Sequence, residues 1–178
     1  MSLAFDFSGQ VAIITGASGG LGAGIARAFA AAGAAVVAHY HRNRAEALQA
    51  EIEETGGRCL LVGADVSTRT GAETLITQAW QAFGRADVLV NNAGTYPLDN
   101  LLEMTDDAWA GVLGANLTSV FLCTQVFARA AIDAEQPGAV VNIASIEAEN
   151  PAPAHSHYNA AKAGVVMHTR AAAAELGP

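Results

Sequence analysis

The chain has 178 residues, 52% of them hydrophobic and 15% charged, and a formal net charge of −8 at pH 7. That length suits one domain with a buried core, and the negative charge argues against a surface that binds nucleic acid. No basic segment precedes a long apolar run, and glycine or polar residues interrupt the apolar stretches, so we expect a cytoplasmic protein without a membrane segment.

The first predicted strand covers residues 10–15, and a glycine-rich turn at residues 16–22 joins it to a helix that ends at Gly33. Glycine lets the backbone come close to a phosphate, and the start of the helix supplies free N–H groups and partial positive charge. The turn is therefore a candidate nucleotide site, and the residues that would contact the nucleotide are Gly16, Ser18, Gly19, Gly20, Leu21 and Gly22.

Two other interpretations of this turn stay open at this point. Its spacing, G-x-x-x-G-x-G, differs from the usual dinucleotide pattern G-x-G-x-x-G, and a tight turn without any ligand would look the same. Residues 16–20 also fit G-x-S-x-G, the nucleophile elbow of α/β-hydrolases, in which Ser18 would be the nucleophile.

The second predicted strand, residues 35–40, ends where an NAD site would place an acidic residue, but basic side chains follow it here. Because a cation attracts a ribose 2′-phosphate that a carboxylate would repel, we expect NADP(H) rather than NAD(H), with a solvated basic turn as the alternative. The residues assigned to this end of the cofactor are Tyr40, His41, Arg42 and Asn43, with Arg44 beside them.

Two further predicted strands bring small and polar residues to the same edge of the sheet. The strand at residues 58–63 leads to Asp65 and Val66, where the Asp65 carboxylate either accepts a hydrogen bond from an adenine amine or caps the following turn. The strand at residues 87–90 leads to a segment in which a ligand can approach the backbone, formed by Asn92, Ala93 and Gly94.

The last two predicted helices and the strand between them carry polar side chains that are candidates for a site. A long helix capped by Thr105 has Asn116 in its apolar stripe, where the amide is either a structural tie or part of a polar path to a site. A strand at residues 138–145 ends on Ser145. The last helix, which is expected to stop at Pro178, carries two side chains one turn apart, Tyr158 and Lys162.

Strand and helix alternate five times, which predicts one α/β domain over residues 1–178, a doubly wound parallel sheet of the Rossmann type in three α/β/α layers. The polar and glycine residues all follow strands and so share the edge where such sheets bind ligands. Cys59 and Cys123 stand alone in apolar stretches, which predicts buried free thiols. His155 and His157 lack the usual zinc-helix spacing, so no metal site is expected.

Four motifs in this order resemble the short-chain dehydrogenase/reductase family across essentially the whole chain. They are the T-G-x-x-x-G-x-G turn at residues 15–22, N-N-A-G at residues 91–94, the serine Ser145, and Y-x-x-x-K at residues 158–162, while Asn116 matches the family's helix asparagine. The resemblance implies an oxidoreductase that transfers a hydride between NADP(H) and a small-molecule carbonyl or secondary alcohol, similar to 3-oxoacyl or small-ketone reductases, in a homodimer or homotetramer.

The resemblance also implies a role for each catalytic residue. Tyr158 would be the acid and base, and the nearby ammonium of Lys162 would favour its ionised form and hold the nicotinamide ribose. Ser145 would hydrogen-bond the substrate oxygen, and Asn116 would hold a water that relays protons. The hydrolase interpretation loses support, because Ser18 follows the first strand and no later acid is assigned to a histidine.

Members of this family continue into two further strands and a substrate lid, which do not follow Pro178 in this sequence. We therefore expect a C-terminally incomplete domain. It is either the recorded part of a longer reductase or a shortened paralogue that binds a nucleotide or a partner without turnover. Glu147 and Glu149 stand where the family often has small or apolar residues, which would disfavour anionic substrates.

Overall fold

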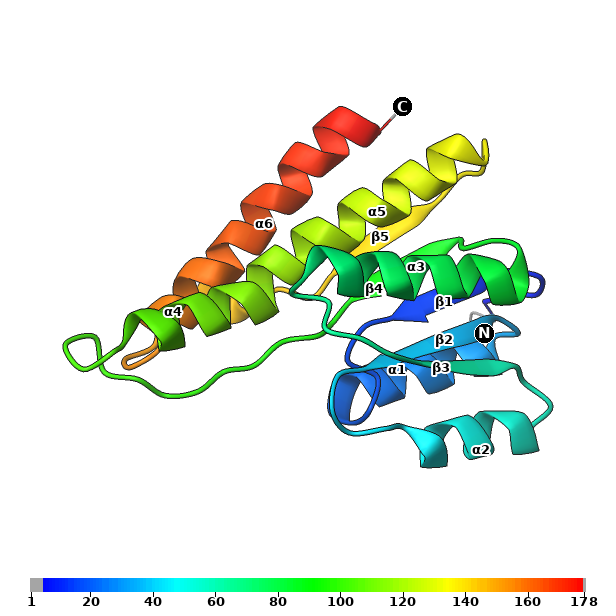
Figure 1. Cartoon of the computed structure of the whole chain (residues 1–178), viewed down its shortest axis with the longest axis horizontal. Coiled ribbons are helices and arrows are strands. Elements are labelled where there is room, and N and C mark those ends of the chain that lie inside the picture. The colour runs from blue at the N-terminus through cyan, green and yellow to red at the C-terminus, as the bar shows by residue number, and fades with distance from the viewer. Residues whose placement is uncertain (1–4, 178) are drawn as a thin grey trace.

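The computed structural model describes residues 5–177, so Pro178 lies outside the described residues. In that part of the chain, five parallel strands form one sheet in the order β3-β2-β1-β4-β5, which confirms the predicted doubly wound fold (Figure 1). The strands are β1 (Val11–Ile14), β2 (Ala35–Tyr40), β3 (Cys59–Gly63), β4 (Val88–Asn91) and β5 (Ala139–Asn142). The helices are α1 (Gly20–Ala31), α2 (Glu46–Glu54), α3 (Arg69–Phe83), α4 (Asp106–Leu113), α5 (Ser119–Asp133) and α6 (Ser156–Leu176).

The central strands β2, β1 and β4 are buried on both faces, which explains why they are apolar at consecutive positions, whereas the edge strand β5 is partly exposed. Ile13 packs into the core under α3 and α5, whereas its neighbour Ile14 packs into the core under α1 and α2. Cys123 belongs to the first core and Cys59 to the second, so the predicted buried free thiols are confirmed. Burial raises the pKa of Cys59 to about 11 and that of Cys123 to about 12, which leaves both thiols unreactive at neutral pH.

The strand order reverses at β1, which lies between β2 and β4. Ile14 is in register with Val90, and the N–H of Thr15 donates to the Val90 carbonyl at 2.9 Å, so the carboxyl ends of the two central strands lie side by side. Open α/β sheets bind ligands in the crevice beyond such a reversal. The topology therefore specifies where a site should be found.

The predicted long helix is two helices joined by a π-helical turn, η1 (Gly114–Thr118). Thr105 caps its start, because its Oγ1 accepts the Ala108 N–H at 3.1 Å. Trp109 and Phe121, which the sequence placed in the apolar stripe, are 40% and 41% exposed, whereas Val112, Asn116 and Val120 of the same stripe are buried. Asp106–Asp133 has 28 residues and contains an 18-residue window with a mean hydropathy of 1.4, enough by length and composition to cross a membrane, but its inner face packs on the sheet.

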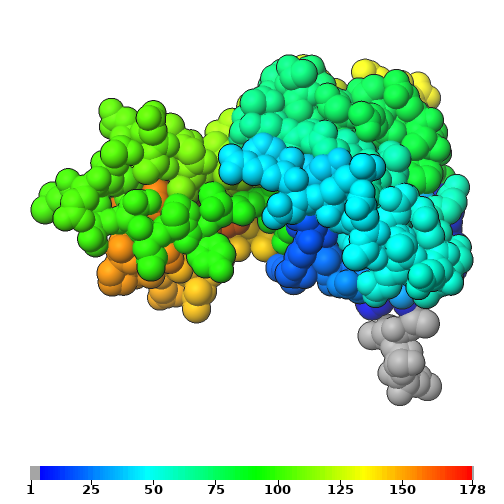
Figure 2. Space-filling view, turned by 60° about the horizontal axis from the view of Figure 1, so that its bottom comes forward, coloured from blue at the N-terminus to red at the C-terminus, as the bar shows by residue number. Residues whose placement is uncertain are grey.

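The segment between β4 and α4 forms a lobe beyond the sheet with α4 and the start of α6 (Figure 1). The N–H of Asp99 donates to the Ala154 carbonyl at 2.8 Å, and Nε2 of the buried His157 lies 3.1 Å from the Asp99 carboxylate. Figure 2 shows a hollow between this lobe, in green and orange, and the N-terminal half, in blue and cyan. The hollow lies along the carboxyl edge of the sheet.

Candidate functional site

A cleft of about 940 Å³ follows the carboxyl ends of the strands. Its walls come from the glycine turn, the ends of β2 and β3, the segment after β4, η1 and α6, which are far apart in the sequence. The structure brings together in this one cleft most of the residues that the sequence assigned to a site: Gly16, Ser18, Gly19, Leu21, Gly22, His41, Arg42, Asn43, Asp65, Val66, Asn92, Ala93, Gly94, Asn116, Tyr158 and Lys162.

Three residues that were assigned to the site do not line the cleft: Gly20, Tyr40 and Ser145. The Tyr40 ring lies over Gly63, where an added Cβ would come within 2.8 Å of the phenol oxygen, so this side chain packs on β3. Ser145 lies beyond the end of β5 and caps a short 3-10 turn, Ile146–Ala148, through its Oγ, which accepts the Glu147 N–H at 3.2 Å.

The glycines at positions 16 and 22 let the turn pack closely against the segment after β4 and the start of α1. Gly16 has φ +65°, and a Cβ there would lie 2.9 Å from the Ala93 Cα. A Cβ on Gly22 would overlap the Gly16 carbonyl oxygen and lie 2.5 Å from Nδ2 of Asn92. That Asn92 amide donates to the carbonyls of Thr15 and Gly16 at 2.9 and 3.1 Å. The segment after β4 therefore holds the turn against the start of α1, whose first turn carries no acidic residue and can receive an anion.

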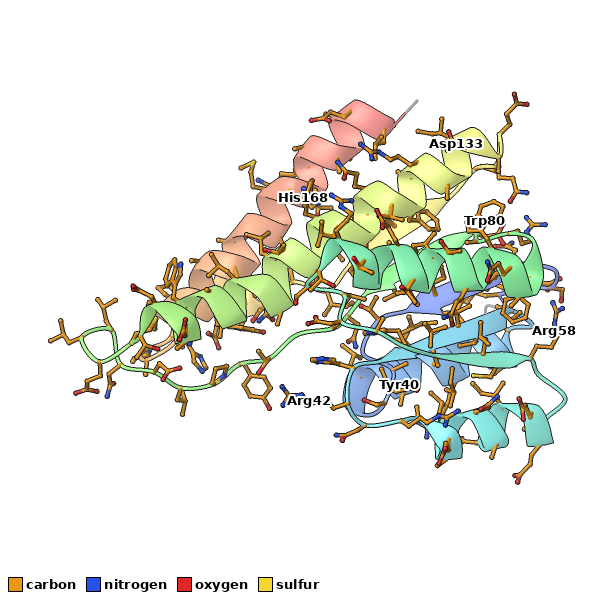
Figure 3. All side chains as sticks on the ribbon, viewed as in Figure 1. Tyr40, Arg42, Arg58, Trp80, Asp133 and His168 are labelled. Carbon is orange, nitrogen blue, oxygen red and sulfur yellow. The ribbon has the colours of Figure 1, made fainter. Side chains whose placement is uncertain are left out.

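The end of the cleft that the sequence assigned to adenosine carries one cation and one carboxylate from the predicted set. Figure 3 shows the exposed Arg42 extending from the end of β2 away from the sheet. Arg44 is instead 3.5 Å from Glu46 and does not line the cleft. Asp65 accepts the N–H and hydroxyl of Ser67 at 3.0 and 2.6 Å, and this hydroxyl contact holds the Asp65 pKa below its usual value. Asp65 thus has the predicted turn-capping role, and the adenine contact stays a prediction.

Asn116 lies in the π-helical turn and is completely buried. Its Nδ2 donates to the carbonyls of Thr95 and Val112 at 2.7 and 3.0 Å. Its Oδ1 is buried and has no hydrogen-bond partner among residues 5–177, and it faces Gly94, where an added Cβ would overlap it. A buried acceptor without a donor is costly, so this oxygen needs a ligand group or a water at the floor of the cleft.

Lys162 and Tyr158 lie together at the far end of the cleft. The Lys162 ammonium donates to the Ile143 carbonyl at 2.7 Å and lies 5.7 Å from the centre of the Tyr158 ring. Burial lowers the pKa of Lys162. The Tyr158 ring is flanked by the rings of Tyr96 and His155, with centres 6.4 and 5.7 Å away.

Glu147 is not a free acid, because its Oε2 lies 2.9 Å from Nδ1 of His155. This contact joins the turn that carries Ser145 to the start of α6, which carries Tyr158. Its negative charge is directed at a histidine rather than at the cleft, which weakens the expectation that Glu147 selects substrates by charge. Glu149 is exposed in the same loop.

Several residues that line the cleft could not be predicted from the sequence. Most contribute backbone or small side chains, and no pattern singles them out. His39 is the exception, since a histidine within an apolar buried strand needs two partners for its ring nitrogens. The residues that sequence reasoning missed are His39, Ser67, Thr95, Tyr96, Gly111, Ala115, Ile143 and Ala144.

The hydrolase interpretation finds no support in this geometry. Ser18 is exposed, and none of the hydrogen bonds found within residues 5–177 joins it to a histidine. Both ring nitrogens of His39, which lines the same cleft, are taken by the backbone of Gly16 and Ala64. A nucleophilic serine requires a base within hydrogen-bond reach.

A family model and a protein of known name both match this chain over most of its length. The family model described as short chain dehydrogenase matches residues 10–178. A protein named 3-oxoacyl-[acyl-carrier-protein] reductase from Synechocystis sp. is 40% identical over 169 residues, which cover 94% of this chain and 68% of that protein.

Solved structures of other proteins resemble this chain in both fold and sequence. A short chain dehydrogenase from Mycobacterium smegmatis has a TM-score of 0.91 and 38% identity, covering 96% of this chain and 72% of that one. Another from Burkholderia cenocepacia, in complex with NADP, has a TM-score of 0.90 and 33% identity, covering 97% and 70%. The chain thus spans about two thirds of the length of such relatives. With its parallel sheet, glycine turn and Y-x-x-x-K helix in the same order, the chain belongs to the short-chain dehydrogenase family.

Proposed function

We propose that this protein is an NADP(H)-dependent oxidoreductase that interconverts a small-molecule carbonyl and a secondary alcohol. The observation that carries the proposal is that the glycine turn, Arg42, Tyr158 and Lys162 line one continuous cleft. The cofactor fits these residues, because Gly19 and Gly20 leave open space at the turn and the start of α1 carries no acid to repel a pyrophosphate. Arg42 is the cation available to a 2′-phosphate.

When bound, NADP(H) would supply or accept the hydride. Tyr158 would donate a proton to the substrate oxygen or take one from it. The Lys162 ammonium, held by the Ile143 carbonyl, keeps positive charge beside that phenol and has further N–H groups for a ribose hydroxyl. Ser145 Oγ accepts the Glu147 N–H, which leaves the hydroxyl proton free, but Ser145 does not line the cleft, so a substrate oxygen would have to reach beyond the end of β5 to accept that proton. Asn116 Oδ1 is the acceptor for a proton-relaying water.

Arg42→Ala is expected to weaken NADPH binding by about 10- to 100-fold, because a charged hydrogen bond contributes about 1.5–3 kcal/mol. NADH lacks the 2′-phosphate, so its dissociation constant should change little. Arg44→Ala is the matched control, since Arg44 is exposed, pairs with Glu46 and does not line the cleft. Fluorescence titration with both nucleotides measures the effect, and equal losses for NADPH and NADH in Arg42→Ala would contradict the assignment.

The second candidate is a paralogue that binds the nucleotide without turnover. A titration with NADPH and NADH followed by a panel of ketones and 3-oxoacyl thioesters separates the two functions, since the paralogue would bind NADPH and reduce none of them. We further propose a cytoplasmic homodimer or homotetramer. The exposed apolar side chains of Phe121 on α5 and Met167 on α6 support an interface between copies, which sedimentation of the purified protein would test.

A further inference from the structure

His39 lies near the end of β2, is 1% exposed and lines the floor of the cleft. Its Nδ1 lies 3.1 Å from the backbone nitrogen of Gly16, and its Nε2 lies 3.0 Å from the carbonyl oxygen of Ala64. A backbone N–H can only donate and a carbonyl can only accept, so Nδ1 must be bare and Nε2 must carry the proton. The surroundings therefore select one neutral tautomer of this ring.

These two contacts connect opposite walls of the cleft. Gly16 begins the glycine turn after β1, while Ala64 precedes Asp65 after β3, and β2 lies between those strands. The backbone carbonyl of His39 also accepts the Ala17 N–H at 2.8 Å. Two successive N–H groups of the turn thus end on His39, which fixes the peptide orientation that precedes the start of α1.

We propose that His39 is a positioning residue for the cofactor, which holds the glycine turn and the Asp65 segment in their binding arrangement only while its Nδ1 is unprotonated. A proton on Nδ1 would face the Gly16 N–H, two donors would oppose each other, and the turn would move. Cofactor affinity then falls in acid because the glycine turn moves out of its binding arrangement. His39 itself does not contact the cofactor. This inference rests on the proposed binding of NADP(H).

The electrostatic surroundings agree with the geometry. Burial lowers the pKa of His39. The hydrogen bond to the Ala64 carbonyl raises that pKa, because it favours the protonated ring, but its effect is smaller than that of burial. The charged groups that act on it are His41 at the end of β2, which opposes protonation, and Asp65 after β3, which favours it. The glycine turn at residues 16–22 contains no titratable side chain.

The sign of the pH dependence follows from this lowered pKa. In the unfolded chain the imidazole pKa is about 6.5, above that of the folded state, so folding favours the neutral ring. The contribution of His39 to stability is complete above about pH 6.5 and declines as the pH falls through the folded-state pKa. Cofactor affinity should decline in the same range, because the same proton disrupts the turn.

The test compares two substitutions that cannot titrate. In His39→Asn the amide oxygen takes the place of Nδ1 and can accept the Gly16 N–H, whereas in His39→Gln the amide nitrogen takes the place of Nε2 and can reach only Ala64. For the unchanged protein, the dissociation constant should rise by up to about tenfold per pH unit in acid, for NADPH and for NADH alike. Both variants should lose this slope, and His39→Asn should bind more tightly than His39→Gln at every pH.

Two controls separate His39 from other titrating groups. The use of NADH removes the 2′-phosphate, which titrates near pH 6. His41→Asn removes the neighbouring imidazole and should keep the slope of the dissociation constant against pH, whatever its effect on affinity at a fixed pH or on the position of the slope. An unchanged slope in His39→Asn, or equal affinities for the Asn and Gln variants, would overturn the proposal.

A measurement on the protein without nucleotide keeps this inference distinct from the proposed function. Nitrogen-15 NMR of the imidazole reports which ring nitrogen carries the proton, and amide exchange reports on the Gly16 N–H. The expected results are a bare Nδ1 at pH 7.5 and a Gly16 amide that loses protection as His39 is protonated. A proton on Nδ1 at pH 7.5, or Gly16 protection that is unaffected by the titration, refutes the role of His39. Failure to bind either nucleotide at any pH would refute the proposed function.

Discussion

Tyr158→Phe is expected to lower kcat for carbonyl reduction by about 10²- to 10⁴-fold, the usual contribution of a positioned acid or base. The change removes only the hydroxyl, so the ring keeps its contacts with Tyr96 and His155. NADPH affinity and the free energy of unfolding should therefore change little. Steady-state kinetics on the best substrate of the carbonyl panel, with an NADPH titration and urea unfolding of the same variant, measure all three quantities.

Tyr96→Phe provides the control, because Tyr96 is 74% exposed and lies beside Tyr158 in the same cleft. Loss of its hydroxyl should lower kcat by less than about tenfold, since no proton transfer is assigned to it. Comparable losses in the two variants would indicate that the phenols act through binding or packing. Undiminished turnover in Tyr158→Phe would remove Tyr158 from the reaction altogether.

Gly22→Ala is expected to lower the free energy of unfolding by about 1–3 kcal/mol, as overpacking of a rigid site does. The new Cβ would overlap the Gly16 carbonyl, which cannot move aside because Asn92 Nδ2 is bonded to it at 3.1 Å and would itself be 2.5 Å away. Displacement of the glycine turn should also weaken NADPH binding by more than about tenfold, which corresponds to about 1.4 kcal/mol. Urea unfolding and a nucleotide titration measure the two effects.

Gly24→Ala is the matched control two residues further along α1. Gly24 is exposed, and an added Cβ there meets nothing within 4 Å. Because alanine favours a helix over glycine by up to about 1 kcal/mol, this variant should be slightly more stable and should bind NADPH as before. If Gly22→Ala were as stable and bound as tightly as Gly24→Ala, the close packing of turn, helix and Asn92 would not matter for the site.

The order of elements and the edge of the sheet that holds the site could both be predicted from the sequence. The apolar run at residues 35–40 became β2 with the same limits, and the glycine turn joined strand to helix as expected. These features depend on neighbours in the chain, such as β-branched runs, glycine stops and a threonine cap. The limits of β5 could not be predicted in this way, because the strand ends at Asn142 and Ser145 belongs to the next turn.

Local sequence was thus enough to predict a doubly wound α/β domain and, through its motifs, most of the residues that meet in the cleft. The partner of each polar side chain depended on the packing of distant segments. Glu147 contacts His155, Lys162 contacts the Ile143 carbonyl, and His39 of β2 contacts Gly16, which follows the neighbouring strand β1. The free Oδ1 of Asn116 likewise follows from the π-helical turn and the approach of Gly94. A hydrogen bond between residues far apart in the chain forms only where the folded backbone brings donor and acceptor within about 3 Å of each other. That distance cannot be derived from the residue types or from their spacing in the sequence.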